Sequence, residues 1–162
     1  MFPDDVQRLA ETVISAAVAR GLWLATAESC TGGLAAAALT GVAGSSAALE
    51  RGFVTYSNTA KVEMLGVPAA LIETHGAVSA EVARAMAEGA ITRSRADVSV
   101  ATTGIAGPGG GSADKPVGLV QFAACGPGGM IHVERRFGDI GREAVRIESV
   151  RQALVLLAGR LE

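Results

Sequence analysis

Residues 22–40 read LWLATAESCTGGLAAAALT, in which a double glycine joins a short apolar run to a run of small helix-forming residues. The apolar run over 22–28 predicts a buried strand, because a few apolar residues bounded by turn signals are typical of a strand inside a sheet. The segment TGGLAAAALT predicts a helix that begins directly after it. A strand followed at once by a helix is the building unit of α/β proteins, so this stretch sets the expected fold class.

The segments on either side continue this alternation. Apolar residues at helical spacing predict a helix over 4–20, ahead of the first strand. After it we expect strands near 48–56 and over 97–104, and helices over 58–66 and about 80–94. Ser79 is the expected N-cap of the helix over about 80–94. The chain then continues with a hairpin of two strands, 116–125 and 130–137, and a final helix over 142–161. The order predicts an α/β fold, a three-layer α/β/α sandwich with a mixed, mostly parallel sheet whose antiparallel edge comes last.

Composition narrows the class of protein. The chain has 162 residues, 49% of them hydrophobic, and we expect a single domain over 1–162. A net charge of −2 argues against nucleic acid as the main partner and against an anionic membrane surface. No apolar stretch reaches the roughly 20 residues of a membrane span, and the N-terminal segment MFPDDVQRLAET is acidic where a signal peptide would be basic. We therefore expect a cytoplasmic protein.

The cysteines and histidines are few and far apart. Cys30 and Cys125 form no CxxC pair, and without a secretory signal we expect no disulfide between them. His75 and His132 have no ligand spacing, so we expect no metal site and no cofactor.

Three polar or glycine-rich loops follow the first three predicted strands: ESCTGG, YSNTAK and TTGIAGPGGG. In open α/β sheets ligands bind beyond the carboxyl ends of the strands. We therefore expect these three loops to meet at one rim of the sheet.

The loop ESCTGG offers two neighbouring nucleophiles. Ser29 stands at a strand-to-helix junction, and free N–H groups of Gly32 and Gly33 in the first helical turn would hold an anion or a developing oxyanion. The alternative is that Ser29 or Thr31 simply caps the helix. Cys30 would need a depressed thiol pKa, and since no histidine lies in the three loops we interpret it as a packed neighbour.

The second loop supplies a candidate base. Burial can bring the pKa of a lysine towards neutrality, so Lys61 is able to take the proton of Ser29. Tyr56, five positions earlier, would relay a proton or donate to the oxyanion. The alternatives are a solvated surface lysine and a half-buried strand tyrosine.

The third loop resembles a phosphate cradle in composition, but it lacks the GK[ST] ending of a P-loop. The alternative is a flexible surface turn. Arg142 and Arg146, one turn apart near the start of the last helix, are both able to bind a phosphate. Alternatively, either arginine is an ordinary exposed helix residue that binds no ligand, and this interpretation suits Arg146 better than Arg142.

The motifs TAESCTGG, YSNTAK, TGIAGPGGG and KPVG, in this order and at these spacings, closely resemble the C-terminal domain of the competence/damage-inducible protein CinA, the nicotinamide-nucleotide amidase family. The resemblance covers nearly the whole chain. It implies an α/β/α sandwich that hydrolyses the carboxamide of nicotinamide mononucleotide to nicotinic acid mononucleotide and ammonia, in pyridine nucleotide recycling.

The resemblance also implies roles for single residues. Ser29 resembles the nucleophile, Lys61 its base and Tyr56 a supporting catalytic group. The residues that we assign to substrate binding are Thr31, Gly32, Gly33, Thr103, Gly104, Gly107 and Arg142. The family often runs GDR directly into the last helix, whereas this sequence reads GDIGR over 138–142.

The expected partner is a small molecule, nicotinamide mononucleotide, with no nucleic acid and no membrane. We expect a homo-oligomer, a dimer. Many relatives carry a further N-terminal domain, and we expect the stand-alone amidase type here. Two other functions stay open: a non-catalytic nucleotide-binding module of the same fold, and a hydrolase that uses Cys30.

Overall fold

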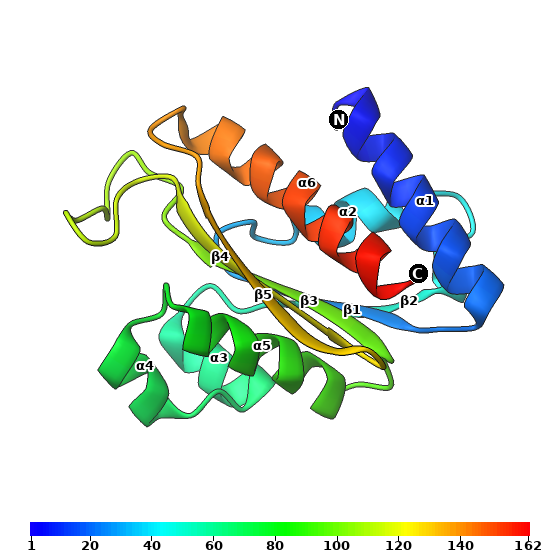
Figure 1. Cartoon of the computed structure of the whole chain (residues 1–162), viewed down its shortest axis with the longest axis horizontal. Coiled ribbons are helices and arrows are strands. Elements are labelled where there is room, and N and C mark those ends of the chain that lie inside the picture. The colour runs from blue at the N-terminus through cyan, green and yellow to red at the C-terminus, as the bar shows by residue number, and fades with distance from the viewer.

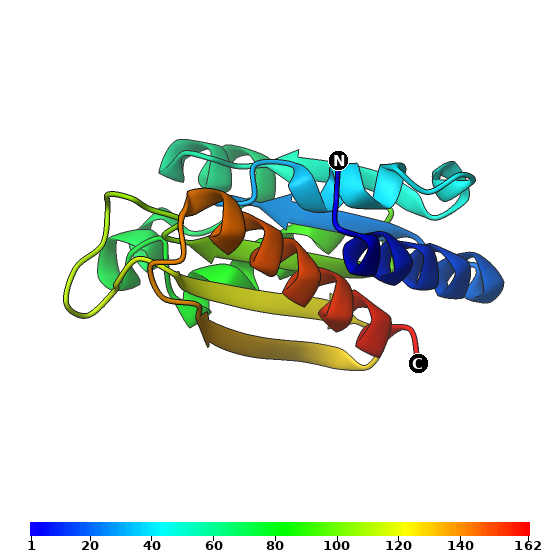
Figure 2. The same ribbon diagram turned by 90° about the horizontal axis from the view of Figure 1, so that it is seen from above.

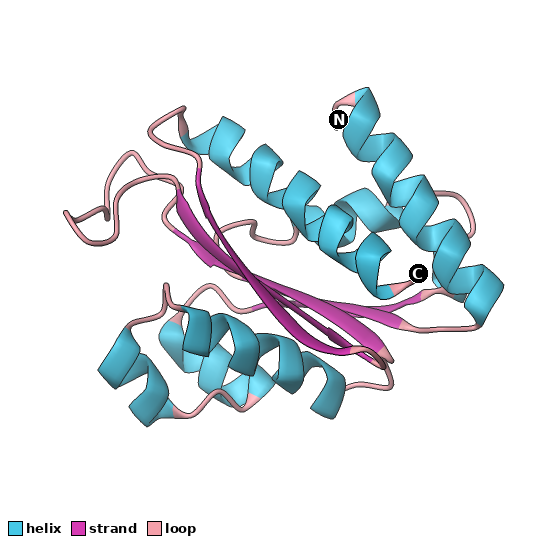
Figure 3. Cartoon of the chain, in the orientation of Figure 1, coloured by secondary structure: helices cyan, strands magenta, loops and turns pink.

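The computed structural model describes residues 1–162 and shows a five-stranded sheet with helices packed on both faces (Figures 1 and 3). Three helices cover one face, and the other three cover the opposite face. The first group is α1 (Asp4–Arg20), α2 (Leu34–Thr40) and α6 (Arg142–Arg160), and the second is α3 (Asn58–Leu65), α4 (Ala69–His75) and α5 (Ala80–Thr92). The expected three-layer α/β/α sandwich is confirmed.

The sheet is mixed, as expected. Its strands are β1 (Leu24–Glu28), β2 (Leu49–Val54), β3 (Val98–Gly104), β4 (Leu119–Gly126) and β5 (Gly129–Arg136), in the spatial order β2-β1-β3-β4-β5. β1 pairs in parallel with β2 and β3, while β4 pairs antiparallel with β3 and β5. All strands except β4 therefore run in the same direction, and the late hairpin forms the antiparallel edge.

Each face of the sheet has its own apolar core. The α1–α2–α6 side packs around Leu24, Val98 and Leu154, and the α3–α4–α5 side packs around Ala25, Met86 and Ala101. Neighbouring residues of β1 belong to opposite cores because side chains alternate along a strand. Figure 2 shows α1, α2 and α6 lying across the sheet on one side of it.

Two elements were missed by the sequence analysis. The helix α4 has only seven residues and begins directly after Pro68, and the 3₁₀ helix η1 (Ser45–Ala47) lies just before the strand that we expected near 48–56. The sequence carries no apolar period long enough to predict elements of this size. None of the helices combines the length and apolar character that a membrane crossing needs.

Strand register aligns the three loops at one rim. Glu28, the last residue of β1, lies opposite Val54 of β2 and Thr102 of β3. The chain leaves β1, β2 and β3 close to the same level and in the same direction. The expected meeting of the three loops is confirmed.

Candidate active site

The centre of the rim is a contact between Ser29 and Lys61. Ser29 directly follows β1, and Lys61 lies in the first turns of α3, on a helix capped by Ser57, whose hydroxyl accepts from the Ala60 N–H. The Lys61 Nζ donates to Ser29 Oγ at 3.0 Å and to the Thr55 carbonyl at 2.8 Å. The fold thus joins two side chains that are 32 positions apart in the sequence.

The environment of Lys61 favours a neutral amine. Lys61 is only 1% exposed, and no carboxylate lies within ion-pairing distance of it. Burial lowers the pKa of this amine below its ordinary value, because the charged form has lost its water. The alternative of a solvated surface lysine is wrong. A neutral amine at hydrogen-bond distance from a hydroxyl is able to take the hydroxyl proton.

Tyr56 and Arg142 form a bridge across the rim. The Arg142 Nη2 donates to the Tyr56 hydroxyl at 2.7 Å, and Nη1 donates to the Gly107 carbonyl at 2.8 Å. Tyr56 is 59% exposed and makes no hydrogen bond to Ser29 or Lys61. The alternative of a half-buried tyrosine is therefore wrong, and the side chain lies at the mouth of the site. One guanidinium links the second and third rim loops to α6.

A cavity of about 240 Å³ opens between these groups. Of the residues that we assigned to the site, Ser29, Tyr56, Gly104, Gly107 and Arg142 line it. The other five assigned residues do not: Thr31, Gly32, Gly33, Lys61 and Thr103. The remaining lining residues are Cys30, Ile105, Ala106, Gly109 and Gly110.

The two assigned threonines use their hydroxyls inside the protein. The Thr31 and Thr102 hydroxyls share a hydrogen bond of 2.8 Å, and both residues are fully buried. The Thr103 hydroxyl donates to the Ala77 carbonyl at 2.9 Å and so holds the segment before α5. These two side chains therefore bond to neighbouring segments of the protein and do not face the cavity.

The third loop, residues 105–118, provides unpaired backbone donors. The N–H groups of Ala106, Gly107, Gly109 and Gly110 donate to no group in the chain. Gly107 has a φ of +82°, and a Cβ there would lie 2.6 Å from a methyl carbon of Val117. Only glycine fits this position, so the loop keeps its N–H groups beside the cavity.

The sequence analysis missed Glu28, whose side chain caps the N-terminus of α2. Its carboxylate is 1% exposed and accepts from the Gly33, Ala35 and Ala36 N–H groups at 2.8–3.0 Å, and from the Thr26 hydroxyl at 2.9 Å. An anion is favoured at a helix N-terminus, and here the protein supplies its own. A glutamate in an otherwise apolar strand, directly before a helix start, was the available signal.

Glu28 changes the expected role of the double glycine. The Gly33 N–H donates to Glu28, and the Gly32 N–H donates to the Ser29 carbonyl at 3.0 Å. The free donors that we expected at these glycines are therefore engaged. In this loop the unpaired N–H groups belong to Cys30 and Thr31.

Cys30 is unsuited to act as a nucleophile. The thiol is buried, and burial raises its pKa to about 12. Neither His75 nor His132 lines the cavity. The hypothesis of a Cys30 hydrolase is not supported by this geometry, because a reactive cysteine needs a stabilised thiolate. No group of His, Cys, Asp and Glu side chains has the arrangement of a metal site.

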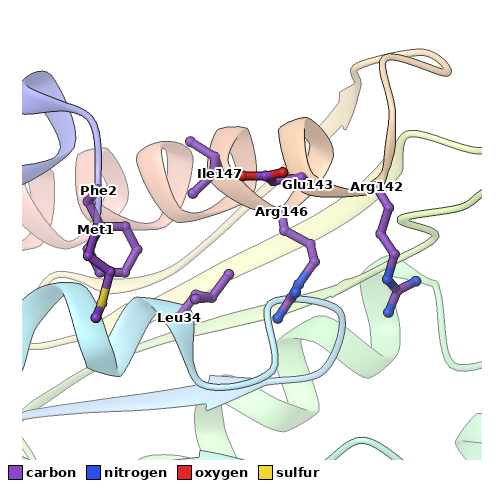
Figure 4. A pocket seen from close by; sticks show the side chains of 7 residues that line it. All are labelled: Met1, Phe2, Leu34, Arg142, Glu143, Arg146 and Ile147. Atoms are coloured by element: carbon purple, nitrogen blue, oxygen red, sulfur yellow. The ribbon is translucent and has the colours of Figure 1, made fainter.

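Arg146 is not an ordinary exposed helix arginine, so that interpretation is wrong. Its Nε donates to the Cys30 carbonyl at 3.1 Å and its Nη2 to the Thr31 carbonyl at 3.0 Å. Figure 4 shows Arg142 and Arg146 reaching from α6 in the same general direction. A second hollow of about 430 Å³ lies on this side, lined by both arginines and by Met1, Phe2, Leu34, Glu143 and Ile147.

Known proteins resemble this chain over nearly its whole length. The family model described as the CinA C-terminal domain matches residues 6–161. A CinA-like protein of Synechococcus sp. (strain RCC307) is 52% identical over 96% of this chain, which covers 38% of that protein. The first curated relatives are all much longer than the matched region, since the chain spans 30–38% of their length.

A relative of similar size is the nicotinamide-nucleotide amidohydrolase PncC of Enterobacter agglomerans. It is 49% identical, and the match covers 92% of this chain and 91% of that protein. Among solved structures, the competence/damage inducible protein CihA from Agrobacterium tumefaciens is 54% identical with a TM-score of 0.98, over 100% of this chain and 99% of that one. A competence damage-inducible protein A from Klebsiella pneumoniae is 38% identical with a TM-score of 0.91, over 96% of both chains.

Proposed function

This chain belongs to the CinA C-terminal domain family, and from that membership we propose that it hydrolyses the carboxamide of nicotinamide mononucleotide, releasing ammonia and nicotinic acid mononucleotide. The relative named as a nicotinamide-nucleotide amidohydrolase supports this substrate. The observation that carries the proposal is the 3.0 Å hydrogen bond between Lys61 Nζ and Ser29 Oγ, made by a lysine that is 1% exposed and forms no ion pair. In this proposal residues 1–162 act as one amidase domain.

The first half of the reaction forms an ester on Ser29. The Ser29 Oγ attacks the carboxamide carbon, and its proton passes to the neutral amine of Lys61. The carbonyl π bond opens and leaves negative charge on oxygen. When the carbonyl re-forms, the C–N bond breaks and Lys61 returns the proton to the leaving nitrogen, which departs as ammonia. The Lys61 amine is neutral again.

The second half consumes one water. Lys61 takes a proton from the water as its oxygen attacks the ester carbon, and then gives the proton back to Ser29 Oγ when that bond breaks. Nicotinic acid mononucleotide leaves and Ser29 is restored. The Lys61 amine thus acts in both halves. In each half it accepts a proton from the attacking group and donates it to the departing group.

The oxyanion needs donors near Ser29. The N–H of Cys30 follows the nucleophile directly, as in the nucleophile elbow, and that of Thr31 is next to it. Both are unpaired. A donor of this kind contributes about 10²–10³ in kcat. Cys30 lines the cavity, whereas Thr31 is fully buried, so we assign the oxyanion to the Cys30 N–H in place of Gly32 and Gly33.

The rest of the cavity suits the nucleotide portion of the substrate. Arg142 supplies a fixed positive charge at the mouth, and the unpaired N–H groups of the loop over 105–118 are suited to phosphate oxygens. Tyr56 orients Arg142 through their shared hydrogen bond. Gly104 and Gly107 let the backbone come close to the ligand.

Ammonia release from nicotinamide mononucleotide by the purified protein tests the proposal, beside Ser29→Ala and Cys30→Ala as a matched pair of neighbouring nucleophiles. We expect Ser29→Ala to abolish release and Cys30→Ala to keep it. Release that survives Ser29→Ala would overturn the assignment of the nucleophile. Saturable binding of the nucleotide by the wild-type protein without any ammonia would indicate the non-catalytic binding module instead.

A further inference from the structure

The loop between β1 and α2 leaves two neighbouring donors without a partner. Its N–H groups at Ser29, Gly32 and Gly33 are all bonded within the chain, whereas those of Cys30 and Thr31 are not. Cys30 is 5% exposed and Thr31 is fully buried. Buried N–H groups without a partner are rare in folded proteins, so two in succession call for a physical reason.

Arg146 determines how this part of the loop is turned. From α6 its guanidinium donates to two successive carbonyls, those of Cys30 and Thr31, at 3.1 and 3.0 Å. On the other side of Cys30, the Ser29 N–H donates to the Thr102 carbonyl at 3.0 Å. The backbone is therefore held both before and after the Cys30 N–H, which lies beside the cavity.

We propose that Arg146 is a positioning residue, which holds the turn at Cys30 and Thr31 so that the unpaired Cys30 N–H, beside the cavity, receives the oxyanion formed when Ser29 attacks. The inference rests on the proposed function. Arg146 acts through the backbone, whereas Arg142 lines the cavity itself. A guanidinium suits this task because its planar fork addresses two acceptors at once, which the single ammonium of lysine does less well.

Gly32 fits the same arrangement. Its φ is +59°, and a Cβ on it would lie 3.1 Å from the Arg146 Nη2. The guanidinium therefore packs directly against the bare Cα of this glycine. The turn that carries the Cys30 N–H therefore packs closely against the arginine that holds it.

Steady-state ammonia release by Arg146→Met and Arg146→Lys tests the proposal, with Arg151→Met as the matched control. Arg151 lies on the same helix but pairs with Asp5 and Glu148. For Arg146→Met we expect kcat to fall about 100-fold, the effect of a lost oxyanion donor, with KM changed less than about threefold. Arg146→Lys should fall in between, and guanidinium chloride at millimolar concentration should restore part of the rate of an Arg146→Ala variant.

A purely structural role predicts another pattern. Arg151→Met should lower the melting temperature without lowering kcat, at a temperature where all variants are folded. The proposal is overturned if Arg146→Met and Arg146→Lys keep wild-type kcat, if they raise only KM, or if their loss of rate merely follows their loss of stability. If Arg146→Met does not fold, Arg146→Lys and the rescue of Arg146→Ala decide. Wild-type protein that releases no ammonia would instead overturn the proposed function, and this inference with it.

Discussion

The loops that follow β1 and β3 both contain several glycines and lie at the same rim, but they are built in different ways. Residues 29–33 are bonded from two sides, by the Glu28 carboxylate and by the Arg146 guanidinium. Residues 105–118 are fastened at the rim by Arg142, and the Lys115 amine donates to the His75 carbonyl at 2.6 Å. Several N–H groups of this second loop have no partner.

Glycine has a different role in each of the two loops. In the first loop, the positive φ values of Gly32 and Gly33 let the chain turn tightly, and the turn is bonded to Glu28 and Arg146, which fixes Ser29 against Lys61. In the second, glycine keeps side chains away from a cavity and leaves donors for a ligand. We expect substitutions around the first loop to change kcat, and those in the second to change KM.

The largest effect should come from Lys61→Met. Loss of the base should lower kcat by about 10³-fold or more, within the range known for general base catalysis. The matched control is Lys115→Met, which removes the chain's other lysine and should change KM more than kcat. The measurement is steady-state ammonia release. Comparable losses of kcat in both variants would contradict the distinction between the two loops.

Glu28→Gln should mainly cost stability. The amide replaces a carboxylate that accepts four hydrogen bonds, and its NH₂ group would face backbone donors. We expect the free energy of unfolding to fall by about 3 kcal/mol, the scale of losing charged, buried hydrogen bonds. Urea unfolding measures this. Glu11→Gln, at an exposed position of α1, should stay within about 0.5 kcal/mol of wild type.

Gly107→Ala tests whether substrate binding depends on the shape of the loop over 105–118. The added methyl would meet Val117 at 2.6 Å and would force a positive φ on alanine, so the loop must shift. We expect KM to rise about tenfold, equivalent to about 1.4 kcal/mol, with a smaller change in kcat. Gly109→Ala is the control, since nothing lies within 4 Å of the added carbon and its φ is not positive. Equal effects of the two would show that the loop adapts freely.

The smallest effect concerns pH. Because the pKa of Lys61 is lowered in the folded protein, the unfolded chain holds one more proton between that pKa and about 10.4. Stability should therefore rise with pH in this window, by at most about 1.4 kcal/mol per pH unit. In Lys61→Met this contribution disappears. Urea unfolding of both proteins at several pH values should show wild type gaining on the variant as pH rises, and parallel curves would contradict a lowered pKa.

The sequence predicted most of the sheet and the longer helices because their apolar periods are local. It also allowed Ser29 and Lys61 to be paired, since both follow strands whose ends meet. It did not predict the contacts of Glu28 and Arg146. Whether a glutamate caps a helix seven positions later, or an arginine reaches carbonyls 115 and 116 positions earlier, depends on how the layers pack.

Burial decides between the alternatives that the sequence left open for the environments of Lys61 and Tyr56. A lysine and a tyrosine in one short segment look equally able to be solvated or buried. Packing of α3 against the sheet buries Lys61, while Tyr56 remains exposed beside Arg142. Such differences come from long-range packing, which no local pattern of residues encodes.

The antiparallel hairpin of β4 and β5 has a consequence for how the protein is made. It returns the chain to the rim, so α6 begins beside a loop that was synthesised 116 residues earlier. Ser29 and Lys61 are therefore synthesised before Arg142 and Arg146. A nascent chain that has not reached α6 holds the proposed nucleophile and base without the two guanidinium groups, so the proposed site is complete only once α6 has been made.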